Sequence, residues 1–299
     1  MNVLVSGGSG FVGREIVRQL VAAGHRVRVL SRGFRRLDPA VRSVRGSVLD
    51  SGSLPEACAG CDAVVHLVGI ISEIGGQTFE RVHVDGTRNI LAAARAGGVP
   101  RFIHMSALGT RPDAVARYHR TKWAAEESVR ASGLDWTLFR PSLVFGPGDH
   151  FVGLFARISR WSPVLPVMGG GQALLQPVAV DEVARCFVGA LTEPLSIGRT
   201  FDLCGSERLS FDAVLDAILA ATGRRRMKLH IPLPIARLQA AVMEVVFPRL
   251  LRRPSPLNRD QLIMLSEDNV GDPEPASQMF RYRPTGFRAG LRPLLAWIR

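Results

Sequence analysis

The sequence predicts an α/β fold in which a doubly wound parallel sheet is covered by helices on both faces. Three observations predict it. The first half of the chain alternates short apolar runs with segments of helical periodicity, which is the pattern of successive βαβ units. A glycine-rich turn separates the first apolar run from the first helical segment. The chain has 299 residues, of which 46% are hydrophobic, enough to bury one large domain or a domain with a smaller lobe.

Short apolar runs mark the strands of this sheet. Six strands are expected, at residues 3–6, 26–30, 43–45, 63–68, 101–106 and 136–140. The fourth run opens with Ala-Val-Val, which suits a strand that is covered on both faces. Helices are predicted between the strands, where apolar residues recur at helical spacing, at residues 11–23, 79–96 and 116–132.

The pattern changes after Pro141. Residues 145–149 and 169–171 are rich in glycine and predict loops. A return to the sheet is expected at residues 175–178 and a helix at 181–191, whereas the chain from 206 onward consists mainly of helical fragments separated by prolines. We therefore expect a sheet domain at residues 1–205, with an insertion at 145–175, and a smaller, mainly helical lobe at residues 206–299.

The glycine-rich turn predicts a nucleotide site. Gly7 allows a tight turn, Gly10 leaves room for a pyrophosphate, and Gly13 lets the helix pack closely on the sheet. The free N–H groups at the helix amino terminus then bind the phosphates. An ordinary glycine turn is the alternative, but the position between the first strand and the first helix favours dinucleotide binding on a Rossmann fold. The expected contacts on this turn are Gly7, Ser9, Gly10, Phe11, Val12 and Gly13.

The end of the second strand distinguishes NADP(H) from NAD(H). An acidic residue there binds the ribose 2′-hydroxyl of NAD, whereas arginine accommodates the 2′-phosphate of NADP. The segment contains Arg32, Arg35 and Arg36 and no acidic residue before Asp38. Guanidinium groups match phosphate oxygens, so we expect Arg32 to bind the 2′-phosphate with help from Arg35 or Arg36. A solvated basic loop is the alternative for Arg35 and Arg36. The sequence favours NADP(H) over NAD(H).

Tyr118 and Lys122 form a Tyr-x-x-x-Lys pair on one face of a predicted helix. An ammonium group beside a phenol favours the phenolate, so we expect Lys122 to lower the pKa of Tyr118 from about 10. The tyrosine can then exchange a proton with a substrate oxygen while hydride moves at a nicotinamide. Lysine is rare in this arginine-rich chain. Its use here indicates either acid/base chemistry or a cofactor clamp without catalysis.

Further motifs match one protein family. Residues 46–50, 68–70, 84–89 and 140–148, with the glycine turn, resemble the extended or atypical branch of the short-chain dehydrogenase/reductase superfamily, which is epimerase/dehydratase-like. The resemblance spans residues 2–185. It implies that Lys122 holds the nicotinamide ribose. The cofactor contacts that it implies outside the glycine turn are Ser47, Val48, Val68, Gly69, Lys122 and Pro141.

The third catalytic position departs from the pattern of this family. Active extended members close the fifth strand with two hydroxyl residues, and the second of them polarises the substrate carbonyl. Here Ser106 stands at the first position and Ala107 at the second. Ser106 is our third candidate catalytic residue, with Thr110 as a distant substitute. The departure weakens the expectation of ordinary carbonyl reduction.

A narrower resemblance involves residues 118–122, 145–151, 176–178 and 265–269. Together they resemble the nucleotide-binding accessory subunit of respiratory complex I and its bacterial stand-alone relatives. In that group the nucleotide, generally NADPH, is largely structural, and related members are implicated in quinone synthesis and assembly. Two functions follow. One is an NADP(H)-dependent oxidoreductase near the respiratory or quinone machinery with a small lipophilic substrate, and the other is a non-catalytic accessory or assembly factor.

Positive charge is concentrated in the last quarter of the chain. The formal net charge is +12, and residues 221–299 contain 14 basic and 6 acidic residues. The excess reflects an arginine-rich composition, or it forms a patch for an anionic membrane surface or an acidic partner. No nucleic-acid partner is expected, because no binding motif accompanies the charge. Residues 234–253 combine an apolar helical stripe with arginines, which fits a helix covering the substrate lobe or one lying in a membrane interface.

Cysteines, histidines and apolar runs set further limits. Four cysteines indicate a reducing compartment, and Cys58 with Cys61 is expected to be a packed, reduced pair. The seven histidines lack the spacing of a zinc helix, so no metal site is predicted. No apolar run is long enough to span a bilayer, and the amino terminus has no leader pattern. We expect a cytoplasmic protein, or a peripheral one on the cytoplasmic face of the inner membrane.

Overall fold

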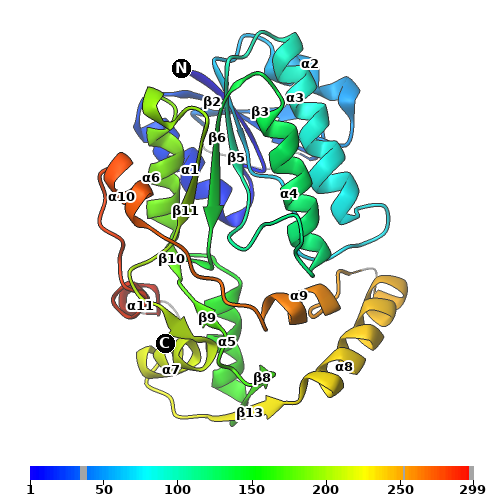
Figure 1. Ribbon diagram of the computed structural model, residues 1–299, viewed down its shortest axis with the longest axis vertical. Coiled ribbons are helices and arrows are strands. Elements are labelled where there is room, and N and C mark those ends of the chain that lie inside the picture. The colour runs from blue at the N-terminus through cyan, green and yellow to red at the C-terminus, as the bar shows by residue number, and fades with distance from the viewer. Residues whose placement is uncertain (34–38, 252, 296–299) are drawn as a thin grey trace.

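Seven parallel strands form the central sheet of the computed structural model, which describes residues 1–33, 39–251 and 253–295 (Figure 1). Their order is β11-β6-β5-β4-β1-β2-β3, and each neighbouring pair is parallel. The strands are β1 (Asn2–Ser6), β2 (Arg26–Ser31), β3 (Val41–Arg45), β4 (Ala63–His66), β5 (Arg101–Met105), β6 (Asp135–Pro141) and β11 (Arg199–Leu203). The doubly wound α/β class is confirmed.

Helices cover both faces of this sheet (Figure 1). One face carries α1 (Phe11–Ala22) and α6 (Val180–Gly189), and the other carries α2 (Leu54–Cys58), α3 (Gly86–Ala96) and α4 (Arg117–Arg130). Side chains alternate across β1, so Val3 and Val5 join the core beneath α1 while Leu4 joins the core beneath α3. Burial on both faces explains why the central strands are almost entirely apolar.

The seventh strand corrects one expectation from the sequence. Residues 175–178 do not return to the central sheet. Instead β9 (Leu174–Leu175) pairs with β12 (Leu209–Ser210), and β10 (Val178–Ala179) pairs with β7 (Val144–Phe145) in short ladders outside it. The sheet is completed by β11, whose side chains alternate between buried and more exposed positions. An edge strand of this kind has a weaker apolar signal than a central strand.

A smaller part of the molecule lies beyond the carboxyl ends of the central strands (Figure 1). Its larger elements are α5 (Phe151–Trp161), α7 (Phe211–Ala221), α8 (Leu233–Val246), α9 (Arg259–Met264), α11 (Phe287–Leu295) and the parallel pair β8 (Val164–Met168) and β13 (Met227–Ile231). The rings of Phe151, Phe155 and Phe211 pack edge to face in its core. Among the described residues, no helix is both long enough and apolar enough to cross a membrane.

Short helical turns connect these elements. Two are 3-10 turns, η1 (Ser51–Ser53) and η3 (Pro194–Ser196), and two are π-helical, η2 (Glu80–Asp85) and η4 (Phe247–Leu251). The π-helix η2 runs directly into α3, so the helix expected at residues 79–96 is present with a wider first turn. Such π turns are frequent at functional sites.

The chain returns to the central sheet near its end. After α10 (Glu274–Met279), the ring of Phe280 packs on Phe139 and Phe201, with centroid separations of 5.5 and 5.3 Å. Phe280 belongs to the same buried core as Val3 in the first strand. Residues beyond 273 therefore contribute to the core of the sheet domain.

Candidate functional site

The glycine turn lies at the carboxyl edge of the sheet, between β1 and α1. The strand order reverses here, because β2 lies on one side of β1 and β4 on the other, and ligands bind at such switch points. Gly7 has a φ of +82°, which residues with a side chain rarely adopt. A Cβ at Gly13 would lie 2.2 Å from Gly7 O, so only glycine lets α1 approach the turn this closely. Ser9 is half-buried within the turn.

The amino terminus of α1 presents backbone donors beside this turn. Gly10 caps the helix with extended backbone angles and no side-chain hydrogen bond, and the first helical bond runs from Arg14 N to Gly10 O. The N–H groups of Phe11, Val12 and Gly13 thus have no partner within the helix. These donors and the helix dipole favour an anion, and Gly10 has no Cβ to obstruct it. A dinucleotide pyrophosphate fits this arrangement.

Arg32 follows β2 and is exposed. Its Nη1 donates to Gln77 Oε1 at 3.0 Å, a surface contact that holds the guanidinium without occupying all of its donors. The predicted assisting residues, Arg35 and Arg36, lie outside the described residues. The preference for NADP(H) therefore remains a prediction that depends here on Arg32.

Ser47 and Val48 form a turn after β3. Ser47 Oγ accepts a hydrogen bond from Leu49 N at 3.2 Å. Val48 is buried, and its carbonyl oxygen accepts a hydrogen bond from Asn89 Nδ2 at 2.9 Å. The side chain of Asn89, on α3, thus fixes the loop in which the adenine contacts are predicted. The contacts themselves remain predictions.

Gly69 and Lys122 come together although they are distant in sequence. Lys122 Nζ donates to Met105 O at 2.9 Å and lies 3.1 Å from the place that a Cβ on Gly69 would occupy. Burial lowers the pKa of Lys122 to about 8. Gly69 therefore leaves space for an ammonium group at the carboxyl end of β4, where the nicotinamide ribose is expected.

Val68 and Pro141 occupy the strand ends on either side of this group. The backbone N of Val68 lies 3.2 Å from the place that a Cβ on Gly7 would occupy, so the turns after β1 and β4 touch. Pro141 is buried at the end of β6, and its carbonyl oxygen accepts a hydrogen bond from Leu108 N at 3.0 Å. The structure thus gathers Gly7, Val68 and Gly69, while Pro141 ends β6, which β5 separates from β4.

Tyr118 is half-buried among aromatic rings at the start of α4. Its ring lies edge-on to His83, His119 and Phe79, with centroid separations of 5.3, 5.2 and 6.0 Å. Burial raises the pKa of Tyr118 to about 12. Among the described residues, no hydrogen bond joins its hydroxyl to Lys122, whose ammonium is bound to Met105 O. The expectation that Lys122 lowers the pKa of Tyr118 is wrong in this structure.

Buried neutral histidines surround Lys122. Burial, and secondarily the charge of Lys122, lowers the pKa of His66 to about 3 and that of His83 to about 2. His66 Nε2 lies 3.1 Å from Thr87 Oγ1, and the His104 ring packs 5.2 Å from that of His66. Both ring nitrogens of His104 are buried without a partner among the described residues. Near pH 7 these imidazoles carry no charge that would compete with the ammonium.

Ser106 lies at the end of the fifth strand, as expected, but it is buried. Its hydroxyl faces Thr110 Oγ1 at 3.5 Å, and its N–H donates to Phe139 O at 2.7 Å. These contacts are all within the protein. Ala107 follows and supplies no hydroxyl. A catalytic role for Ser106 remains a prediction.

A buried charge network lies one helical turn after Lys122. Glu126 is fully buried, and its carboxylate accepts hydrogen bonds from Arg140 at 2.8 and 2.7 Å and from Arg130 at 2.6 Å. Both guanidinium groups also lie over the ring of Trp123. Burial favours the neutral acid, but these hydrogen bonds hold the pKa of Glu126 below its ordinary value. The charged carboxylate in turn favours the ammonium form of Lys122.

The carboxyl-terminal part of the chain is tied to the site at two places. Asp260, on α9, accepts hydrogen bonds from the backbone N–H groups of Arg117 and Tyr118, both at 3.2 Å, and so caps α4. Asn269 accepts a hydrogen bond from Ser142 Oγ at 2.6 Å. The motif at residues 265–269 thus has a structural role. Sequence reasoning missed both Asp260 and Glu126. The partners of Asp260 lie 143 and 142 residues away in the chain. Glu126 has one partner at i+4, Arg130, but only the fold shows that its carboxylate is buried and that Arg140 reaches it from β6.

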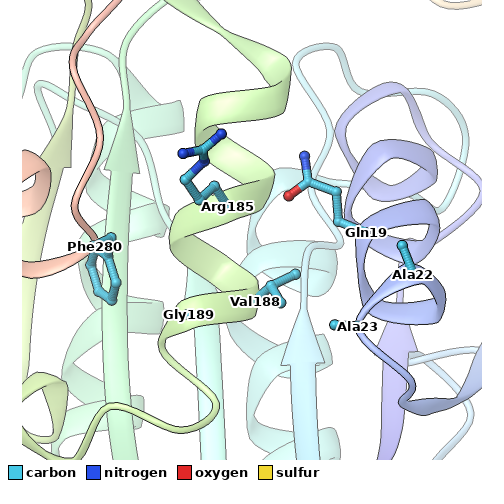
Figure 2. A pocket seen from close by; sticks show the side chains of 7 residues that line it. All are labelled: Gln19, Ala22, Ala23, Arg185, Val188, Gly189 and Phe280. Atoms are coloured by element: carbon cyan, nitrogen blue, oxygen red, sulfur yellow. The ribbon is translucent and has the colours of Figure 1, made fainter.

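A surface hollow of about 450 Å³ lies elsewhere (Figure 2). It is lined by Gln19, Ala22, Ala23, Arg185, Val188, Gly189 and Phe280. This end of α1 is about 13 Å along the helix from its glycine turn, since each residue advances a helix by 1.5 Å. Unpaired donors and missing Cβ atoms converge at the glycine turn and not at this hollow, so the glycine turn remains the predicted nucleotide site.

Comparison with known proteins supports a nucleotide-binding family. Residues 7–149 match a family described as NAD(P)H-binding. The chain is 38% identical over 207 residues to ceramide reductase of Caulobacter vibrioides, covering 67% of this chain and 64% of that protein, which is just under two thirds. It is 30% identical to 2-alkyl-3-oxoalkanoate reductase of Stenotrophomonas maltophilia over 99% of each chain.

Two further likenesses broaden this comparison. The chain is 30% identical to the mitochondrial NADH dehydrogenase [ubiquinone] 1 alpha subcomplex subunit 9 of Arabidopsis thaliana, covering 89% of this chain and 70% of that protein. The structure of UDP-glucuronic acid 4-epimerase from Bacillus cereus shares the fold, with a TM-score of 0.75 at 20% identity over 100% of this chain and 99% of that one. The chain therefore belongs to the NAD(P)H-binding atypical short-chain dehydrogenase/reductase family, which is epimerase/dehydratase-like.

Proposed function

We propose that this protein is an NADP(H)-dependent oxidoreductase that reduces a carbonyl group of a lipophilic substrate near the respiratory or quinone machinery. Tyr118 carries the proposal. It is a half-buried phenol at the start of α4, the helix that one turn later supplies Lys122. Two relatives are named reductases, of ceramide and of 2-alkyl-3-oxoalkanoate. Both names denote molecules with alkyl chains, which supports a lipophilic substrate.

The residues at the strand ends fit a nicotinamide dinucleotide. The amides at the start of α1 would hold the pyrophosphate, Lys122 the nicotinamide ribose, and Arg32 the 2′-phosphate. When bound, the reduced dinucleotide supplies a hydride. The neutral state of His66 and His83 leaves Lys122 as the positive charge at that end of the site.

Tyr118 supplies the proton in this proposal. As the carbonyl carbon gains hydride, the carbonyl oxygen takes the proton of Tyr118 Oη, and the product is an alcohol. The phenolate that is left then recovers a proton from solvent, which completes the cycle. Near pH 7 the phenol is protonated and has a proton to give, although its raised pKa makes it a weaker acid than a free tyrosine.

The chain offers a matched control for testing this role, because it has two tyrosines. Tyr118→Phe should lower kcat for NADPH oxidation by about 10²- to 10⁴-fold with an alkyl ketone, a quinone or a membrane lipid extract as oxidant. Its Kd for NADPH should stay unchanged. Tyr282→Phe should retain full activity, because Tyr282 is buried in the main core. Equal kcat values for Tyr118→Phe and the unmodified protein would sink the proposal.

A different observation favours a second function, that of an accessory or assembly factor with a structural nucleotide. Ser106 is buried against Thr110, and Ala107 occupies the second hydroxyl position, so no hydroxyl from this strand end is available to polarise a carbonyl. The relative in Arabidopsis thaliana is named as a subunit of NADH dehydrogenase. Bound nucleotide at 100 times its Kd adds about 2.7 kcal/mol of stability without any turnover. NADPH that co-purifies and stays reduced with every oxidant, while Tyr118→Phe keeps full cellular function, would favour this alternative.

A further inference from the structure

The outward face of α8 carries large apolar side chains. Ile235, Leu238, Val242 and Val245 are 59%, 69%, 54% and 48% exposed. Their spacing of three or four residues places them on one stripe of the helix. A helix on the surface of a protein in water normally turns such a stripe toward the core.

The inward face of α8 is small by comparison. Ala236 and Ala240 are fully buried and meet Leu262 in a minor core. Two alanine methyl groups bury far less apolar area than the four exposed side chains opposite would. Packing within the protein therefore does not account for the apolar stripe, and the amphipathic pattern of α8 is inverted.

Exposed apolar side chains also occur in the segments that precede and follow α8. Eight of the 15 exposed large hydrophobic residues in the described chain lie between positions 227 and 251. The α8 patch consists of these residues, namely Met227, Leu229, Ile235, Leu238, Val242, Val245, Leu250 and Leu251. They lie on β13, α8 and η4, which follow one another in the chain; β13 lies at the end of the molecule opposite α2, and α8 rises from it along one side (Figure 1). Single exposed apolar residues are ordinary, but a concentrated patch marks an interaction surface.

Arginines border the α8 patch. Arg237, Arg249 and Arg253 are exposed, and none of them has an ion pair within the described part of the chain. The acidic residue of α8, Glu244, is already paired with Arg259 at 2.8 Å. The patch therefore combines apolar side chains with free positive charge and no free carboxylate on its helix.

We propose that the α8 patch docks on the surface of an anionic lipid bilayer. An apolar stripe beside cationic side chains is what a helix lying in the membrane interface requires, because arginine reaches the headgroups while the stripe enters the acyl boundary. A second copy of this chain fits less well, since it would bring the same arginines together. An acidic protein would pair with the arginines, but its carboxylates would not cover an apolar stripe that runs from Ile235 to Val245. The docking does not depend on the proposed reaction, because the α8 patch contains no residue of the candidate site.

The segment after α8 connects the patch to the candidate site. Asn258 Nδ2 donates to Ile71 O at 2.8 Å, and Ile71 lies two residues after Gly69. Asp260 caps α4 at Tyr118. A docked α8 would thus hold the site next to the bilayer, where a lipophilic substrate is concentrated.

Sedimentation with lipid vesicles tests the docking. The full-length protein should bind vesicles of phosphatidylcholine mixed with phosphatidylglycerol and bind those of phosphatidylcholine alone much more weakly. Leu238→Ser combined with Val242→Ser should lower binding about a hundredfold, since each side chain contributes about tenfold when fully buried. Arg249→Gln should lower it about fivefold. Leu195→Ser is the matched control, because Leu195 is 71% exposed but lies outside the patch, and it should bind like the unmodified protein.

Three results would overturn this inference. If the double variant binds vesicles as tightly as the unmodified protein, the apolar stripe does not contact the bilayer. Equal binding to neutral and anionic vesicles would exclude the charge requirement. A dimer in solution that the double variant abolishes, with no vesicle binding by the unmodified protein, would assign the patch to a second copy. A salt series on the unmodified protein tests the charge requirement even if a variant fails to fold. Binding to anionic vesicles must weaken as the salt concentration rises.

Discussion

Gly13→Ala tests the geometry of the nucleotide turn most directly. The new Cβ would lie 2.2 Å from Gly7 O and 2.7 Å from Gly8 Cα, and both contacts are with backbone atoms that no rotamer change can move. Overpacking of this kind typically destabilises the folded state by about 3 kcal/mol at the upper end. Replacing glycine by alanine in a helix stabilises it by about 1 kcal/mol, which offsets part of that cost. We expect the free energy of unfolding to fall by about 2 kcal/mol and Tm by about 4 °C. Displacement of the turn amides should weaken nucleotide binding about a hundredfold.

Gly153→Ala is the control for this change. Gly153 is also helical, in α5, but nothing lies within 4 Å of the place that its Cβ would occupy. Helix propensity alone should then raise its stability by about 1 kcal/mol. Thermal denaturation and titration with NADPH, both monitored by fluorescence, measure the two effects. A Gly13→Ala protein with an unchanged or higher Tm and an unchanged Kd would refute the reasoning.

Three further predictions concern other parts of the site. Arg32→Ala should lower the preference for NADP over NAD by tenfold or more in paired Kd titrations, since a charged hydrogen bond to the 2′-phosphate is lost; an unchanged ratio would contradict this. Glu126→Gln should lower the free energy of unfolding by about 3 kcal/mol, because Arg140 and Arg130 lose a buried carboxylate. A Tm unchanged from that of the unmodified protein in thermal denaturation would count against this. Burial lowers the pKa of Lys122 from 10.5 to about 8, so the folded protein binds fewer protons than the unfolded chain above pH 8. Its stability should then rise between pH 8 and pH 10 relative to Lys122→Met in urea denaturation, and parallel pH profiles would refute this.

The sequence predicts the central strands well because burial on both faces makes them apolar throughout. It predicts the edge strand poorly. β11 keeps buried Phe201 and Leu203 but places Arg199 at its exposed start, so its apolar run is broken. Residues 175–178 have the stronger strand pattern, yet they form only short ladders, since apolar character does not specify which strand is the partner.

In the candidate site, too, one part was predictable from the sequence and another was not. The turn at Gly7 and Gly13 is predictable because its function depends on local backbone geometry. The surroundings of Tyr118 are not, because its aromatic neighbours and the carboxylate of Asp260 arrive from distant segments. Burial then raises a pKa that spacing alone predicts to fall. For α8, the apolar period is the same whether the stripe faces the core or the exterior, and only the fold shows that it faces outward.

The packing of Phe280 against Phe139 and Phe201 has a consequence for synthesis of the chain on the ribosome. β1, an inner strand of the sheet, is translated first, but the core that covers it is complete only after Phe280 and Tyr282 have been added. The nascent sheet must therefore wait for almost the whole chain while its apolar strands are open to wrong pairing. For the same reason, a carboxyl-terminal lobe taken from a relative would not simply replace this one. The transplanted segment would have to carry aromatic side chains that fit against Phe139 and Phe201 as Phe280 does.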